Sequence, residues 1–116
     1  MNLPLFIEES KVPVFLSYFS PITINAITLG PFVFSRSVIS EKTRRHETIH
    51  WEQYKETLII GFLVFYLMSW LWGILKYRSG KIAYYQIPFE QEAYSNDDDW
   101  VYLLNRKKYT WLKYKI

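Results

Sequence analysis

The sequence predicts an α+β fold that is mainly α-helical with a small N-terminal β-hairpin, in a single domain spanning residues 1–116. Three observations predict it: β-branched residues and a turn signal are concentrated in residues 22–36, helix signals begin at Ser40, and a second helix start follows at Pro88. Such a short chain forms one small domain, which buries a smaller fraction of its surface than a large one. Residues 1–20 alternate proline with short aromatic stretches, so we expect them to be irregular or partly extended.

The hairpin is expected over residues 22–36. Ile22 to Leu29 is rich in β-branched residues, Gly30-Pro31 marks a turn, and Phe32-Val33-Phe34 follows as the second strand. We expect this hairpin to lead into the next helix.

The helix expected over residues 40–56 begins at Ser40, an N-cap candidate that precedes a glutamate in the first turn. It carries both histidines of the chain in the sequence His46-Glu47-Thr48-Ile49-His50. Residues four apart on a helix point the same way one turn apart, so the two imidazoles can bind one metal ion. Glu47 lies about 100° around the helix, near enough to reach a metal-bound water.

A catalytic zinc site usually holds three protein ligands and one water. Because the chain has no cysteine and no other histidine, the third ligand must be a carboxylate. The candidate lies in Pro88-Phe89-Glu90-Gln91-Glu92-Ala93-Tyr94, where Pro88 starts a helix expected over residues 88–108. Glu90 is in its first turn, whereas Glu92 points about 200° away on the same helix.

The two motifs resemble those of the gluzincin class of zinc metallopeptidases, whose third ligand is a glutamate in a later helix. The resemblance implies one Zn²⁺ ion bound by His46, His50 and Glu90, with Glu47 as the general base that deprotonates the zinc-bound water. It also implies a peptide or protein substrate. The sequence looks closest to membrane-embedded gluzincins that process prenylated or misfolded membrane proteins, and to small uncharacterised bacterial and phage proteins with both motifs.

In gluzincin-like folds, a strand edge beside the HExxH helix aligns the peptide substrate. The resemblance therefore implies this role for Phe32, Val33 and Phe34, and an exposed edge does offer N–H and C=O groups to an extended chain. A hairpin with a purely structural role remains an equal alternative.

Tyr94 stands where the gluzincin pattern has an aspartate. This removes one expected acceptor for the second ring N–H of a ligating histidine, and Asp97, Glu56 or a backbone carbonyl remains to replace it. A tyrosine such as Tyr84, Tyr85 or Tyr94 is a candidate to stabilise the oxyanion.

The helix has no evident stop before residues 57–75, nineteen uncharged and mostly apolar residues that span about 28 Å as a helix. A simple membrane crossing would separate His50 from Glu90 on opposite sides of the lipid. We therefore expect a kink at Gly61, or a turn near residues 70–73, and a monotopic or re-entrant membrane protein rather than a single-span one. By the resemblance we place it at the cytoplasmic face of a bacterial inner membrane.

Composition agrees with a membrane surface. Aromatic residues make up 20% of the chain, net charge is +3 and the pI is about 9.1, which suit lipid headgroups. We find no nucleic-acid-binding motif and expect no nucleic-acid partner. An aromatic core or an oligomer interface is an alternative use of these rings.

Two rival functions stay open at this point. In the first, the chain is a membrane adaptor that a zinc ion stabilises and that catalyses no reaction, since its small size leaves little room for substrate pockets. Alternatively, it would be a small structural membrane protein in which the histidine spacing is accidental.

Overall fold

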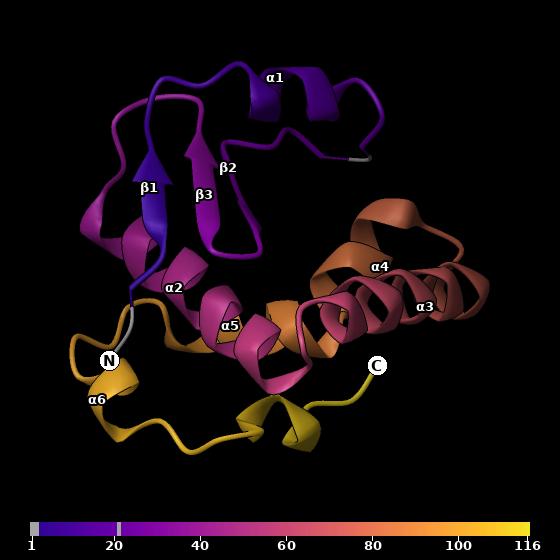
Figure 1. Ribbon diagram of the computed structural model, residues 1–116. Helices are drawn as coiled ribbons and strands as arrows, with labels where there is room; N and C mark the ends of the chain where they lie inside the picture. The colour runs from indigo at the N-terminus through magenta and orange to yellow at the C-terminus, as the bar shows by residue number, and fades with distance from the viewer. Residues whose placement is uncertain (1–2, 21) are drawn as a thin grey trace.

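The computed structural model describes residues 3–20 and 22–116 (Figure 1). It is mainly helical with a small N-terminal sheet, which confirms the predicted α+β class. The elements run in the order β1 (Leu5–Ile7), α1 (Val12–Ser17), β2 (Ala26–Leu29), β3 (Phe32–Ser35), α2 (Glu41–Glu56), α3 (Ile60–Tyr77), α4 (Gly80–Gln86), α5 (Pro88–Asn96), α6 (Tyr102–Asn105) and a 3-10 turn at Thr110–Lys113.

The sheet contains the predicted hairpin and one strand that was not predicted. β2 and β3 are antiparallel around a turn in which Gly30 has φ 61°, a conformation that favours glycine. β1 pairs in parallel with β3, so the strand order is β1-β3-β2. Within residues 3–20, strand β1 agrees with the expected partly extended chain, whereas helix α1 was not expected.

The strand order corrects one expectation about the site. Phe32, Val33 and Phe34 belong to β3, which is the central strand and is paired on both sides, so they do not form an edge. The hydrophobic pattern of these residues does not show that β1 pairs with them. The two outer strands are β1 and β2, and β2 is the one that contacts helix α2.

Helix α2 matches the predicted range. The Ser40 side chain accepts a hydrogen bond from the Thr43 backbone N–H at 3.2 Å and so caps the helix N-terminus. The helix lies beneath the sheet in Figure 1 and contacts β2, α3 and α5. Its buried face carries both histidines.

The long apolar segment is separated from α2 by a sharp bend. Leu58 and Ile59 have φ of 58° and 66°, and the Ile59 N–H donates to the Tyr54 carbonyl at 2.8 Å. The bend thus lies just before Gly61, where we expected a kink, and residues 70–73 continue the helix rather than turn.

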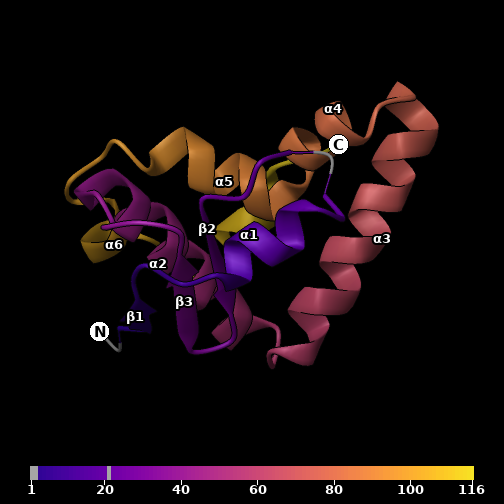
Figure 2. The same cartoon turned by 90° about the horizontal axis from the view of Figure 1, so that it is seen from above.

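The chain returns alongside α3 through α4. A Cβ placed on Gly73 would lie 2.9 Å from the Ala83 Cβ, so the glycine permits a close approach of the two helices. Figure 2 shows α4 folding back beside the far end of α3, with α5 leading on toward α2. This return brings Glu90 back to the histidines.

The helix expected over residues 88–108 is two shorter elements. α5 ends at Asn96, and α6 begins at Tyr102. The run from Asp97 to Asp99 follows α5, where negative charge opposes the helix dipole, and the Arg45 guanidinium donates to the Asp97 carbonyl. Negative charge at the C-terminal end of α5 disfavours the longer helix that the sequence pattern predicted.

An aromatic cluster holds the helices together. Tyr54 and Phe62 stack at 3.8 Å between ring centroids, and Phe62 stacks on Phe89 at 4.4 Å. Trp111 of the C-terminal turn packs edge-on against Phe89. Part of the aromatic content thus forms core, while α3 keeps most of its apolar surface exposed.

Within the described residues, α3 is the helix whose length and composition are sufficient to cross a membrane, and only 17% of it is buried. A core helix of a soluble protein can have the same length and composition.

Candidate metal centre

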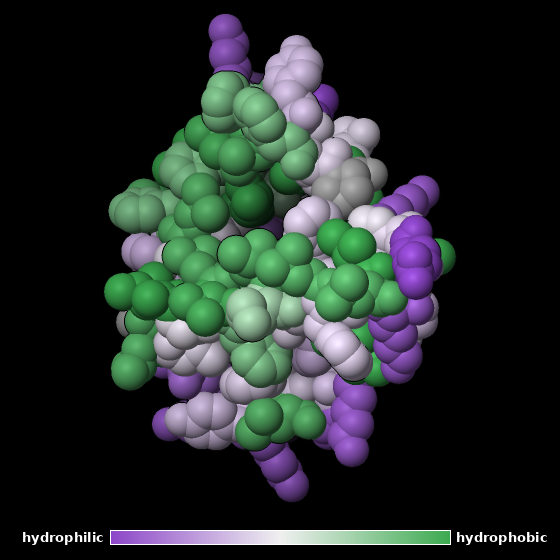
Figure 3. All heavy atoms as spheres, turned by 90° about the vertical axis from the view of Figure 1, so that its right-hand side faces the viewer, coloured by the Kyte–Doolittle hydropathy of each residue, from purple (hydrophilic) through white to green (hydrophobic). Residues whose placement is uncertain are grey.

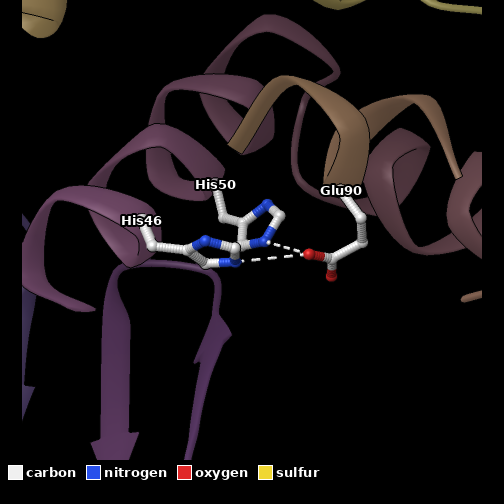
Figure 4. Close-up of side chains that lie close together, drawn as sticks. All are labelled: His46, His50 and Glu90. Carbon is white, nitrogen blue, oxygen red and sulfur yellow. Dashed lines mark hydrogen bonds and ion pairs between the residues drawn. The ribbon is translucent and has the colours of Figure 1, made fainter. Parts of the chain in front are cut away.

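The three residues predicted as metal ligands lie together. His46 and His50 project from adjacent turns of α2 with ring centroids 4.9 Å apart, and Glu90 approaches them from the first turn of α5 (Figure 4). Glu90 Oε1 lies 3.3 Å from His46 Nε2 and 3.1 Å from His50 Nε2. All three side chains are buried, and one donor atom from each lies within 4.8 Å of the others. The group is therefore able to hold a metal ion.

The opposite ring nitrogen of each histidine has its own acceptor. His46 Nδ1 lies 3.0 Å from Asp97 Oδ2, and His50 Nδ1 lies 2.8 Å from Gln53 Oε1. An Nδ1–H that donates to these oxygens leaves the Nε2 lone pair free for a metal. Asp97 is therefore the acceptor beside His46 Nδ1, and it was one of the three predicted alternatives.

Two contacts to the ligands were not predicted. Gln53 lies three residues after His50 on the same helix, a spacing that brings side chains together and was a usable signal. The Tyr66 hydroxyl of α3 donates to Glu90 Oε2 at 2.6 Å. No local sequence pattern predicts the contact of Tyr66 with Glu90, because it depends on how α3 packs against α5.

Opposite charges stabilise the histidines and Glu90 against one another. Burial lowers the pKa of His46, but hydrogen bonds from its ring to Asp97 and Glu90 outweigh burial and raise this pKa to about 10. Burial raises the pKa of Glu90, but the two histidines outweigh it and hold the pKa well below its usual value. Each partner thus favours the charged form of the other.

Glu47 lies between the cluster and the sheet. Its Oε1 accepts a hydrogen bond from the Thr28 hydroxyl of β2 at 3.0 Å, and its Oε2 lies 3.7 Å from His46 Nε2. Thr28 therefore fixes one oxygen of the carboxylate while the other faces the candidate ligands.

The three tyrosines named from the sequence have different positions. The hydroxyls of Tyr84 and Tyr94 are 2.8 Å apart, and the Tyr94 ring packs against the His46 ring with centroids 4.5 Å apart. Burial raises the pKa of both tyrosines, so each hydroxyl keeps its proton at neutral pH. Tyr85 contacts Tyr94 but lines a neighbouring hollow rather than the cleft that contains the histidines.

A cleft of about 510 Å³ contains the cluster, Glu47, Tyr84 and Tyr94. One wall is β2 with the residues before it, and the other is formed by α3. Figure 3, which looks from the α3 and α4 side, shows a hollow bordered by hydrophobic side chains. The α3 wall presents Phe62, Leu63, Tyr66, Leu67 and Trp70.

Comparison of the chain with protein-family models, with curated proteins and with solved structures gives no match. Two imidazole nitrogens and one carboxylate oxygen form a donor set that suits a divalent metal such as zinc.

Proposed function

We propose that this chain is a zinc-dependent metallopeptidase of the gluzincin type that acts at a membrane surface. One observation carries the proposal: Glu47 lies in the same cleft as the group formed by His46, His50 and Glu90, with one carboxylate oxygen facing it. A metal site with only a structural role has no need of a carboxylate held beside its ligands and open to a cleft.

The residues present fit a zinc ion. The acceptors at both Nδ1 atoms leave both Nε2 atoms available, and Tyr66 holds the Glu90 oxygen that faces away from the rings. When bound, zinc supplies Lewis acidity, which polarises a carbonyl and makes water a stronger acid.

Glu47 is proposed as the general base. The Thr28 hydroxyl holds Oε1, so Oε2 is the oxygen that receives a proton from the attacking water and returns it to the leaving amine. Tyr84 and Tyr94 line the cleft as proton-bearing hydroxyls, which suits them to donate to the developing oxyanion.

The strand edge proposed to align the substrate is β2. Residues Ala26 to Leu29 line the cleft, and Thr28 connects this strand to Glu47. An extended peptide pairing with β2 would lie between the strand and the α3 wall, next to the candidate metal ligands.

The membrane assignment is based on α3. Its exposed residues include Ile60, Val64, Met68, Trp72 and Leu75, each at least 58% exposed, which is a large apolar surface for a protein in water. Because α4 and α5 return beside α3, we propose that the protein lies in one leaflet rather than spans the bilayer. Membrane lipid would cover this surface, and the cytoplasmic face of a bacterial inner membrane remains our proposed location.

The test combines metal content and hydrolysis. Protein purified in mild detergent should contain one zinc ion per chain and cleave a mixture of apolar peptides, with cleavage followed by mass spectrometry. Glu47→Gln should keep zinc and lose hydrolysis by roughly 10²-fold or more. Glu52→Gln is the matched control on the same helix, because Glu52 pairs with Lys55 and does not line the cleft.

The outcomes separate the rival functions. If the wild-type protein contains one zinc ion per chain but cleaves none of the peptides, the result would favour the non-catalytic adaptor. Absence of zinc from wild type would remove both the peptidase and the adaptor.

A further inference from the structure

A chain of buried polar side chains connects the C-terminal segment to the candidate metal ligand His50. The amide of Gln53 stands in the middle. Its Oε1 faces His50 Nδ1 at 2.8 Å, while its Nε2 donates to the Phe89 carbonyl at 3.0 Å and to Glu92 Oε1 at 2.9 Å. Both amide hydrogens therefore have acceptors, and the amide oxygen is left for the histidine.

Glu92 is in turn held by the C-terminal segment. Arg106 donates to Glu92 through Nε at 2.5 Å and through a terminal nitrogen at 3.1 Å, and the Tyr102 hydroxyl donates at 2.6 Å. Glu92 is fully buried, and the Arg106 side chain is 3% exposed. A buried carboxylate keeps its position only while its cation and hydrogen bonds are in place.

We propose that Arg106 is a positioning residue for the metal centre, acting through Glu92 and Gln53 to fix the tautomer of His50. The orientation of the Gln53 amide decides which ring nitrogen of His50 carries the proton. With the oxygen toward the ring, Nδ1 donates its hydrogen to the amide, and Nε2, on the side of Glu90, is the nitrogen available to a metal ion. With the amide reversed, its N–H₂ group would face Nδ1, and the proton would occupy the nitrogen that must bind the metal.

The chain offers a matched control at Glu56. Arg106 also binds this carboxylate at 2.6 Å and 3.0 Å, and Trp111 donates to it at 3.1 Å. Glu56 makes no described contact with Gln53 or His50, so it serves to anchor the C-terminal segment alone. Loss of Glu56 and loss of Arg106 thus share a structural effect but differ in their effect on the tautomer.

This inference rests on the proposed metal centre but not on peptide hydrolysis, and its test needs only zinc. We would measure zinc affinity by competition with a chromogenic chelator for wild type, Arg106→Gln, Gln53→Leu and Glu56→Gln. Thermal unfolding of each metal-free variant would report stability separately. In the zinc-loaded protein, where the imidazole is neutral, the ¹⁵N chemical shifts of the His50 ring would report which nitrogen carries the proton.

Arg106→Gln and Gln53→Leu should each lose roughly 10–100-fold in zinc affinity, the range typical of lost contacts around metal ligands. Glu56→Gln should lose stability while its zinc affinity stays within about threefold of wild type, because the contacts of His50 are intact. The His50 ring in Gln53→Leu should show a mixture of tautomers. If Arg106→Gln fails to fold, Gln53→Leu and Arg106→Lys decide the question, and the lysine variant should retain part of the affinity.

Three results would overturn the inference. Wild-type zinc affinity in Gln53→Leu would show that the amide does not act on His50. Equal losses of affinity in Glu56→Gln and Arg106→Gln would show that Arg106 serves only to anchor the segment. A wild-type protein that binds no zinc would remove the proposed centre together with this inference.

Discussion

Replacing Gly73 by leucine tests whether the packing of α4 on α3 positions the site. A Cβ at this position would lie 2.9 Å from the Ala83 Cβ and 3.1 Å from its Cα, so α4 must move by roughly 1 Å to restore an ordinary contact near 3.8 Å. Overpacking of this kind costs typically about 1–3 kcal/mol, and the contact with backbone puts Gly73→Leu at the upper end.

The sign of the change in unfolding free energy shows whether α3 and α4 pack against each other. In a free helix, leucine would stabilise relative to glycine by about 0.8 kcal/mol, because it has the higher helix propensity. In the packed arrangement, a net loss of roughly 2 kcal/mol would lower the melting temperature by about 8 °C for a chain of this size. Because α4 leads directly into α5, displacement of α4 should also move Glu90 and weaken zinc binding.

Thermal unfolding in mild detergent, with and without zinc, measures both effects. Val64→Leu is the matched control, since Val64 is an exposed position of α3 and the change should be nearly neutral. A melting temperature for Gly73→Leu equal to or above that of wild type would refute the close packing of α3 and α4. In that event, the return of the chain to the histidines would need another explanation.

Two further predictions concern the histidines. Asp97→Ala should weaken zinc binding by roughly 10–100-fold through the lost acceptor at His46 Nδ1, and a competition titration that shows no change would exclude this role. In the metal-free protein the pKa of His46 is raised from 6.5 to about 10, so its contribution to stability is complete below pH 6.5 and is lost as the pH rises toward 10. Zinc binds neutral imidazoles, so the rise in melting temperature on adding zinc should become larger over the same pH range. A rise that does not change with pH would contradict a zinc site that contains His46.

The local parts of the fold could be predicted because they depend on neighbouring residues. Ser40 and the residues after it specify the start of α2, and the four-residue spacing of His46 and His50 places both rings on one face. Gly30 likewise marks the hairpin turn. The third member of the candidate metal group was also predictable, since Glu90 follows a helix start and no cysteine or other histidine competes with it.

The parts that were missed depend on tertiary contacts. β1 joins the sheet by pairing with β3, which removed the edge expected at Phe32 to Phe34. Gly61 predicted a kink, but the bend is made by Leu58 and Ile59, whose side chains rarely adopt positive φ, so its position was not predicted. The contacts of Tyr66 with Glu90 and of Arg106 with Glu92 form because α3 and the C-terminal segment pack around these carboxylates, which are far from them in sequence.

The metal coordination itself is the central claim, and X-ray absorption at the zinc edge of the purified, zinc-loaded protein tests it most directly. We predict one zinc per chain with two imidazole nitrogens and additional oxygen donors at about 2.0–2.2 Å, and loss of the imidazole scattering in a His46→Ala/His50→Ala variant. A zinc shell without imidazole in wild type, or no bound zinc, would contradict the account.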